Sequence, residues 1–178
     1  MRRSVVTPHV QTLAILGTLI LAGCDIVGGD IVGVDGSCVD PAVSPQEEKL
    51  SIEQGIWGQL EFWEGNFVPE VECPSGTIRG VERTVLVFEA TPDGRAVPAA
   101  QDDFFSEVQT QLVDSVRSDA SGFFQVALEP GEYSVFVREG SLLYAHSWDD
   151  SDVVTVLVQR ASPTLLKLDI IYAATTPY

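Results

Sequence analysis

Basic residues are scarce in this 178-residue sequence. Ten lysines and arginines stand against 26 aspartates and glutamates, and the formal net charge is −16. Such a chain repels nucleic-acid phosphates, because nucleic-acid binding depends on clustered Lys and Arg. It also repels anionic lipid head groups, so we expect any membrane attachment to be covalent rather than electrostatic. Nucleic acid is therefore excluded as an expected partner.

Histidine is rarer still, with only His9 and His146 in the chain. His9 lies in a segment that we expect to be removed, which leaves His146. Ser141, Ser147 and Asp149 lie near His146 in the sequence and could in principle form a Ser–His–Asp triad with it. Their order and loop context, however, match no known nucleophile framework. We therefore expect His146 to be a loop histidine and the chain to have no catalytic residue, no enzymatic activity and no cofactor.

Long hydrophobic runs are also lacking, apart from Leu13–Ala22 near the N-terminus. This run follows the basic Met1–Arg3 and is too short to span a bilayer as a permanent helix. It ends in Leu21-Ala22-Gly23-Cys24, which resembles the lipobox of bacterial lipoproteins. The resemblance implies removal of residues 1–23, thioether lipidation of Cys24 and acylation of the new N-terminus. An ordinary signal peptide followed by a coincidental cysteine is the alternative.

A lipidated Cys24 places the chain in the cell envelope, anchored to a bacterial membrane, with the outer membrane or the cell surface favoured. More than one acyl chain is needed for a stable anchor, which lipoprotein acylation implies. Residues 24–54 begin Gly- and Asp-rich and are expected to form a flexible tether. The two remaining cysteines, Cys38 and Cys73, can form a disulfide in this compartment, or they can stay free thiols.

Helical periodicity is absent from the rest of the chain, and short alternating or apolar segments replace it. Residues 55–64 alternate with a period of two, and residues 84–90 form a continuous apolar run typical of a strand buried on both faces. Residues 104–116 fit two strands or one long edge strand, and residues 153–158 and 165–172 predict the last two strands. Seven or eight short strands indicate an all-β sandwich.

The stretch Ser118–Val137 carries the clearest turn signals. Asp119 and Gly122 predict a first turn, and Pro130-Gly131 predicts a second one. Between and after these turns, residues 124–128 and 133–137 alternate as half-buried strands do. The pattern predicts a β-hairpin made of these two segments.

These segments also carry a family resemblance. Gly55–Leu60 looks like the opening strand of carboxypeptidase regulatory-like domains. The spacing of Asp119, Gly122, Phe124, Leu128, Pro130-Gly131 and Tyr133 is similar to the central signature of that family. The resemblance covers about residues 55–172 and implies a transthyretin-like β-sandwich of Greek-key topology in a domain of residues 55–178. It is informative for fold and not for function, because turn and core residues make it up.

One loop offers a weak metal candidate. Asp149, Asp150 and Asp152 place three carboxylates in one loop, and calcium prefers oxygen ligands. Their spacing does not match an EF-hand loop, so a solvated acidic loop is the favoured interpretation and no metal is assigned.

Two aromatic residues raise the question of a ligand. Trp57 and Trp63 point the same way from one predicted strand, opposite its apolar face. If exposed together, they would form a platform for sugar rings or a partner protein; we favour partial cover or core packing. The sequence therefore predicts a non-catalytic, lipid-anchored envelope protein whose β-sandwich binds an envelope protein or glycan or has a structural role. The alternative is a carbohydrate-binding surface lipoprotein that uses Trp57 and Trp63.

Overall fold

The computed structural model describes residues 44–68, 76–147 and 153–176. In these ranges the chain forms β-strands and one 3-10 helix, η1 (Glu47–Lys49). The strands are β1 (Gly55–Asn66), β2 (Thr77–Gly80), β3 (Thr84–Glu89), β4 (Ala96–Pro98), β5 (Phe104–Val108), β6 (Leu112–Arg117), β7 (Phe123–Val126), β8 (Gly131–Glu139), β9 (Leu142–Tyr144), β10 (Val154–Val158) and β11 (Pro163–Thr175). No helix in this part of the chain is long and apolar enough to cross a membrane.

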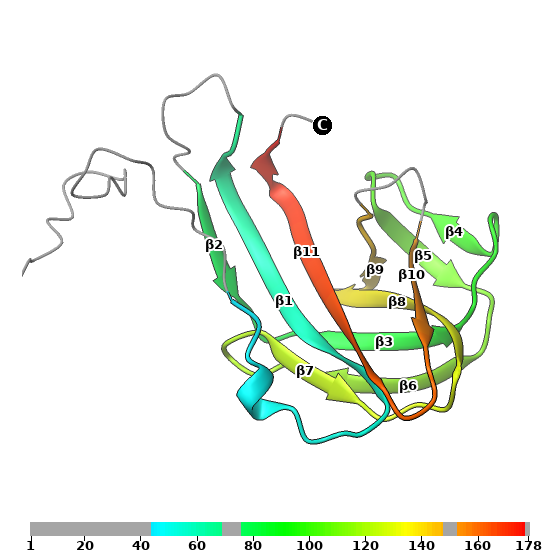
Figure 1. The fold of residues 1–178 in the computed structure, drawn as a ribbon. Coiled ribbons are helices and arrows are strands. Elements are labelled where there is room, and N and C mark those ends of the chain that lie inside the picture. The colour runs from blue at the N-terminus through cyan, green and yellow to red at the C-terminus, as the bar shows by residue number, and fades with distance from the viewer. Residues whose placement is uncertain (1–43, 69–75, 148–152, 177–178) are drawn as a thin grey trace, which may run out of the picture.

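The first sheet is built around β1. The last strand, β11, pairs with β1 in parallel from Gly55↔Pro163 to Asn66↔Thr175. On the other side of β1, β7 pairs with its first half and β2 with its second half, both antiparallel. The first and last strands of the domain therefore lie side by side (Figure 1).

The second sheet has the order β4-β5-β9-β8-β3-β6, and β10 pairs with β8 next to β9. Every pairing in it is antiparallel. Figure 1 shows β3, β6 and β8 running across β1 and β11, so that the two sheets face each other. The predicted all-β sandwich is confirmed, and the described residues divide into eleven strands, more than the seven or eight predicted.

The core has two parts, one on each face of the second sheet. Val85 and Val87 of β3 point into the main core between the sheets. Leu86 and Phe88 of the same strand point the other way, into a second cluster that includes Phe136 of β8. Strand β3 is therefore buried on both faces, as its continuous apolar run predicts.

The predicted hairpin of residues 124–128 and 133–137 is wrong. Strand β7 pairs with β1 in the first sheet, whereas β8 pairs with β3, β9 and β10 in the second. The connection crosses from one sheet to the other because Phe124, Val126 and Leu128 fill the core between the sheets. Residues 104–116, which fitted one strand or two, contribute to two strands of the second sheet: β6 lies at one end, and β5 is the second strand from the other end, beside β4.

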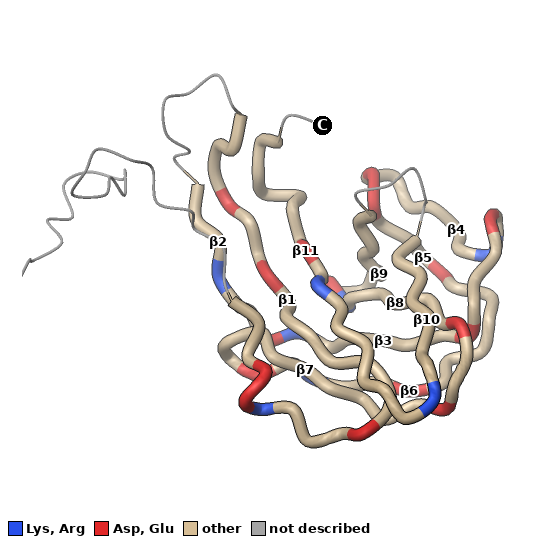
Figure 2. Tube along the Cα trace, viewed as in Figure 1, with Lys and Arg blue, Asp and Glu red and all other residues tan. Residues whose placement is uncertain are grey.

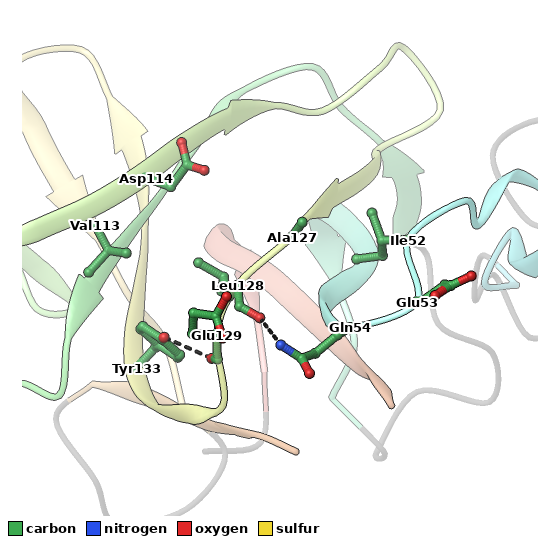
Figure 3. Close-up of a pocket in the computed structure, with 9 residues that line it drawn as sticks. All are labelled: Ile52, Glu53, Gln54, Val113, Asp114, Ala127, Leu128, Glu129 and Tyr133. Atoms are coloured by element: carbon green, nitrogen blue, oxygen red, sulfur yellow. Dashed lines mark hydrogen bonds between the residues drawn. The ribbon is translucent and has the colours of Figure 1, made fainter. Parts of the chain in front are cut away.

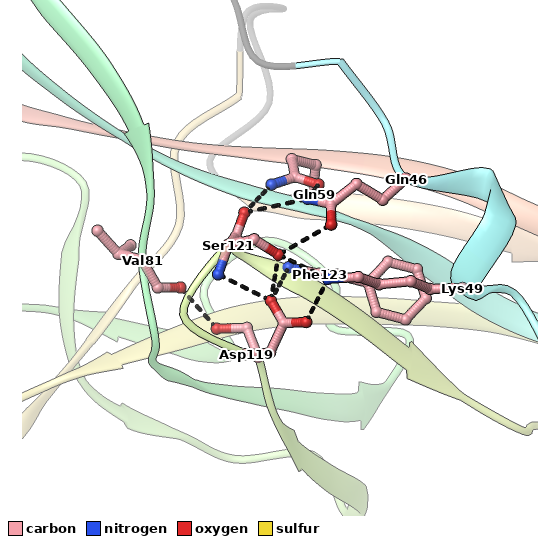
Figure 4. Close-up of polar contacts among 8 residues, drawn as sticks. Gln46, Lys49, Gln59, Val81, Asp119, Ser121 and Phe123 are labelled. Atoms are coloured by element: carbon pink, nitrogen blue, oxygen red, sulfur yellow. Dashed lines mark hydrogen bonds and ion pairs between the residues drawn. The ribbon is translucent and has the colours of Figure 1, made fainter.

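The predicted turn at Asp119 is present and holds the segment that precedes β1. The carboxylate oxygen Oδ1 of Asp119 accepts backbone hydrogen bonds from Ser121 and Phe123, at 2.9 and 3.1 Å. The ammonium of Lys49 donates to Asp119 Oδ2 at 2.7 Å, and Gln46 bonds Ser121 (Figure 4). The last part of the expected tether, residues 44–54, therefore lies against the sandwich.

Candidate functional site

A groove of about 530 Å³ lies at the side of the sandwich, where the end of the tether meets the second sheet. Residues 52–54 line one wall, and residues 113–114 of β6 line the opposite wall (Figure 3). Residues 127–129, between β7 and β8, and Tyr133 of β8 complete it. The groove therefore combines three regions that are separate in the sequence: residues 52–54, 113–114 and 127–133.

Specific hydrogen bonds hold the walls in place. Gln54 donates from Nε2 to the carbonyl oxygen of Leu128 at 2.8 Å and accepts at Oε1 from the backbone of Ala161 at 3.0 Å. The hydroxyl of Tyr133 donates to the carbonyl oxygen of Glu129 at 2.9 Å. Because these bonds join the tether, the β7–β8 connection and the β10–β11 turn, the groove is built into the fold.

One wall of the groove is an open strand edge. Strand β6 pairs with β3 on one side, and no described strand pairs with its other side. The backbone N–H of Ser118 donates to the carbonyl oxygen of Arg83 and therefore points toward β3. Successive residues of a strand direct their N–H groups to opposite sides, so the N–H of Ser115, three residues earlier, points to the open edge. That N–H donates to Oδ1 of the adjacent Asp114 at 2.7 Å. The edge donor is therefore satisfied locally rather than by another strand.

The groove carries three carboxylates: Glu53, Asp114 and Glu129. None of them forms an ion pair with a lysine or arginine within the described residues. Acidic residues outnumber basic ones along the described chain (Figure 2), so no excess of positive charge offsets the groove. The site therefore attracts cations and repels anions.

Sequence reasoning missed this site. Its three acids lie in three separate segments, and each by itself looks like an ordinary solvated residue. In the folded chain residues 112–117 form an exposed strand, with Leu112 and Val113 at 47% and 41% exposure, and this exposure cannot be read from the sequence. Such residues on a surface strand indicate an edge rather than a core.

The two predicted aromatic ligands are not exposed together. Trp57 is only 7% exposed, with its ring centre 6.5 Å from that of Phe123. Trp63 is half-buried, lies 4.9 Å from the Phe67 ring centre, and has the ammonium of Lys167 5.4 Å above its ring centre. Both rings therefore pack against neighbouring side chains.

A charged cluster accompanies Trp63 on the same face of the first sheet. The fully buried carboxylate of Glu61 forms an ion pair with Lys167, with Oε2 and Nζ 3.0 Å apart, and the Nζ of Lys167 is also 3.6 Å from Oδ1 of Asp169. Burial raises the pKa of Glu61, outweighing the hydrogen bonds from Lys167 and Trp63 that lower it. Although burial lowers the Lys167 pKa, the nearby Asp169 and Glu61 raise it more, so the net direction is upward. In this cluster the ammonium of Lys167 is paired with the carboxylates of both Glu61 and Asp169.

His146 has a partner that the sequence did not indicate. Its Nδ1 lies 3.0 Å from Oδ2 of Asp103, which precedes β5 and is distant in sequence. Asp149, the acid counted from sequence, lies outside the described residues. The observed pair links two loops, a role that only the folded chain reveals.

Several predicted site residues lie outside the described part of the chain. They are the lipidation site Cys24, the candidate disulfide pair Cys38 and Cys73, and the weak calcium candidates Asp149, Asp150 and Asp152. Among the residues that are described, no group of three or more His, Cys, Asp or Glu side chains is placed to hold a metal ion.

Comparison with known proteins gives no family. No protein-family model matches the chain, and no curated protein sequence is similar to it.

Proposed function

We propose that this chain is a non-catalytic lipoprotein of the bacterial cell envelope whose β-sandwich binds a partner protein. An acylated Cys24 would anchor it, and a disulfide between Cys38 and Cys73 would tie the tether to the domain. The observation that carries the binding proposal is the groove, because it joins a strand edge and carboxylates that have no strand or ion-pair partner among the described residues. Proteins commonly recognise extended segments at such edges.

One further feature supports a binding role rather than catalysis. The buried polar groups bond one another, as Glu61 does with Lys167 and His146 with Asp103. The resemblance of residues 55–172 to carboxypeptidase regulatory-like domains concerns the fold. By that resemblance the sandwich is transthyretin-like, with Greek-key topology.

The anchor is tested by labelling growing cells with an alkyne analogue of palmitate. We expect label and membrane association for the wild-type chain and the loss of both for Cys24→Ala. Intact mass before and after reduction reports the Cys38–Cys73 bridge. An unlabelled, freely secreted wild-type chain would overturn the localisation.

Binding is tested by site-specific crosslinking in those cells. A photoreactive residue at Val113, in the groove, should crosslink to a discrete protein partner. The same residue at Thr77, exposed on β2, is the matched control and should not form that crosslinked species. Equal crosslinking from both positions would contradict binding in the groove.

A further inference from the structure

We propose that the groove takes an extended segment of a partner protein that carries lysine or arginine, and that this segment pairs with β6 as an added strand. The inference rests on the proposed binding function and names the chemistry of its partner. Its basis is the open edge of β6 together with the three carboxylates of the groove.

The backbone of β6 provides the first part of the recognition. Between Val113 and Arg117 the strand has no described neighbour on its open side, so backbone donors and acceptors remain there for another strand. Strand β6 contains neither Pro nor Lys, which commonly block edge pairing. Arg117 is held by Glu82, so it does not oppose a cationic segment as a free charge.

Asp114 couples backbone pairing to charge. Its carboxylate now accepts the N–H of Ser115 on the open edge. A carbonyl oxygen of an incoming strand can accept that N–H instead, which frees the carboxylate. A lysine or arginine on the incoming segment then compensates the freed charge of Asp114, and Glu53 and Glu129 add to the negative charge of the groove lining. A neutral or acidic strand gives no such compensation.

The apolar lining suits alternating side chains. Ile52, Ala127 and Leu128 line the groove beside its carboxylates (Figure 3). Side chains of an extended segment point alternately to its two faces, so apolar residues can enter the groove while cationic residues reach its acidic rim. The partner sequence expected is therefore a short alternation of apolar and basic residues.

A second copy of this chain fits poorly. Each copy carries a formal net charge of −16, so two copies repel at low salt. An antiparallel pair of β6 strands would also bring the two Asp114 carboxylates into one edge. The charge of the groove thus favours a partner of opposite charge.

The test uses the lipidated chain in nanodiscs of zwitterionic phosphatidylcholine, which does not attract cationic peptides electrostatically. The probe is a fluorescent eight-residue peptide of alternating Val and Lys, and binding is followed by anisotropy. One control replaces Lys by Glu, and another keeps Lys but N-methylates alternate amides, which blocks strand pairing. Hydrogen exchange of residues 109–117 reports where the peptide binds.

Two protein variants separate charge from backbone pairing. Glu53→Gln/Asp114→Asn/Glu129→Gln removes the charge and should weaken the Val–Lys peptide roughly tenfold. Ser115→Pro removes a donor that β3 does not use and should abolish added protection in β6 while thermal melting stays close to wild type. If that variant does not fold, the N-methylated peptide tests the same step.

Some outcomes would overturn the inference. They are no binding at millimolar peptide, equal binding of the Glu peptide, equal binding of the N-methylated peptide, or concentration-dependent dimerisation that Ser115→Pro abolishes. These results leave the crosslink from Val113 unaffected. If that crosslink forms while the peptide fails, the groove binds a partner by another mode; if both fail, the binding function itself is wrong.

Discussion

Glu61 and Lys167 lie on neighbouring parallel strands and join a fully buried carboxylate to an ammonium that is 44% exposed, with 3.0 Å between Oε2 and Nζ. Lys167 thus compensates a negative charge on β1 that has little access to water. Lys167→Met should lower the free energy of unfolding at neutral pH by about 2 kcal/mol, because it leaves Glu61 buried and unpaired. Urea denaturation measures this, and Glu61→Gln/Lys167→Met should recover most of the loss. A single variant as stable as wild type would contradict the role of the pair.

The same variant should show a distinctive pH dependence. Burial raises the pKa of Glu61 above its unfolded value near 4.5, so stability falls as pH rises through the folded pKa and is regained as pH falls toward 4.5. Removal of the Lys167 charge should strengthen this trend. The difference in unfolding free energy between wild type and Lys167→Met should therefore shrink steadily from pH 8 to pH 4.5. A constant difference over this range would show that Glu61 does not titrate as inferred.

Ionised Asp119 should stabilise the fold, and this stabilisation should be lost in acid. Burial favours its neutral form, but hydrogen bonds from Lys49, Ser121 and the backbone of Phe123 outweigh this and lower its pKa from 3.8 to about 2. Its stabilisation is thus present above pH 3.8 and lost as pH falls toward 2. Wild type should exceed Asp119→Asn by about 1 kcal/mol at pH 5, a value reduced for solvent screening, and by almost nothing at pH 2. Acid titration of both proteins in urea checks this, and a gap that persists at pH 2 would contradict it.

Lys49 should fasten the end of the tether. Its ammonium bonds Asp119 and Ser121 and lies 5.6 Å from the Phe123 ring centre. Lys49→Ala should increase hydrogen exchange in residues 45–54 several-fold while strands β3 and β8 stay protected. Glu48→Ala, a change at the neighbouring position of η1, is the control. Equal exchange in both variants would show that the contacts of Lys49 do not hold the segment.

Gly58 should tolerate no side chain. A Cβ at this position would lie 1.7 Å from the carbonyl oxygen of Leu166, within the backbone of the parallel β1–β11 pair. Gly58→Ala should destabilise the fold by at least about 3 kcal/mol, because neither strand can move without breaking the pair. Gly131→Ala, whose Cβ would first meet Tyr133 at 3.4 Å, should change stability by about 1 kcal/mol or less. Similar melting temperatures for the two variants would contradict this.

The sequence predicted local structure better than it predicted pairing. The apolar run of β3 correctly indicated burial on both faces. The turn at Asp119 could be predicted because it is held by hydrogen bonds between residues that are close in the sequence. The predicted pairing of β7 with β8 was wrong, because the alternation of apolar residues shows which side chains are buried but not which strand supplies the backbone partner. That choice depends on Phe124 and Val126 packing between sheets, which involves distant residues.

The candidate site was largely hidden from sequence reasoning for the same reason. Glu53, Asp114 and Glu129 come together only when the tether, β6 and the β7–β8 connection are in place. The aromatic pair was visible, but its exposure depended on neighbours such as Phe123 and Lys167. Single candidate residues such as Trp57 and Trp63 can be found from the sequence, whereas a site built from distant segments can be found only in the folded structure.

The parallel pairing of β1 and β11 has a mechanical consequence. The chain enters this pair at Gly55 and leaves it at Thr175, which lie at opposite ends of the two strands. Tension between the N-terminal and C-terminal ends of the domain therefore acts along the strands, in shear. Because the backbone hydrogen bonds of the pair then share the load, they must break together instead of peeling apart one after another. A module tethered at one end and pulled from the other would thus resist extension along its longest strands.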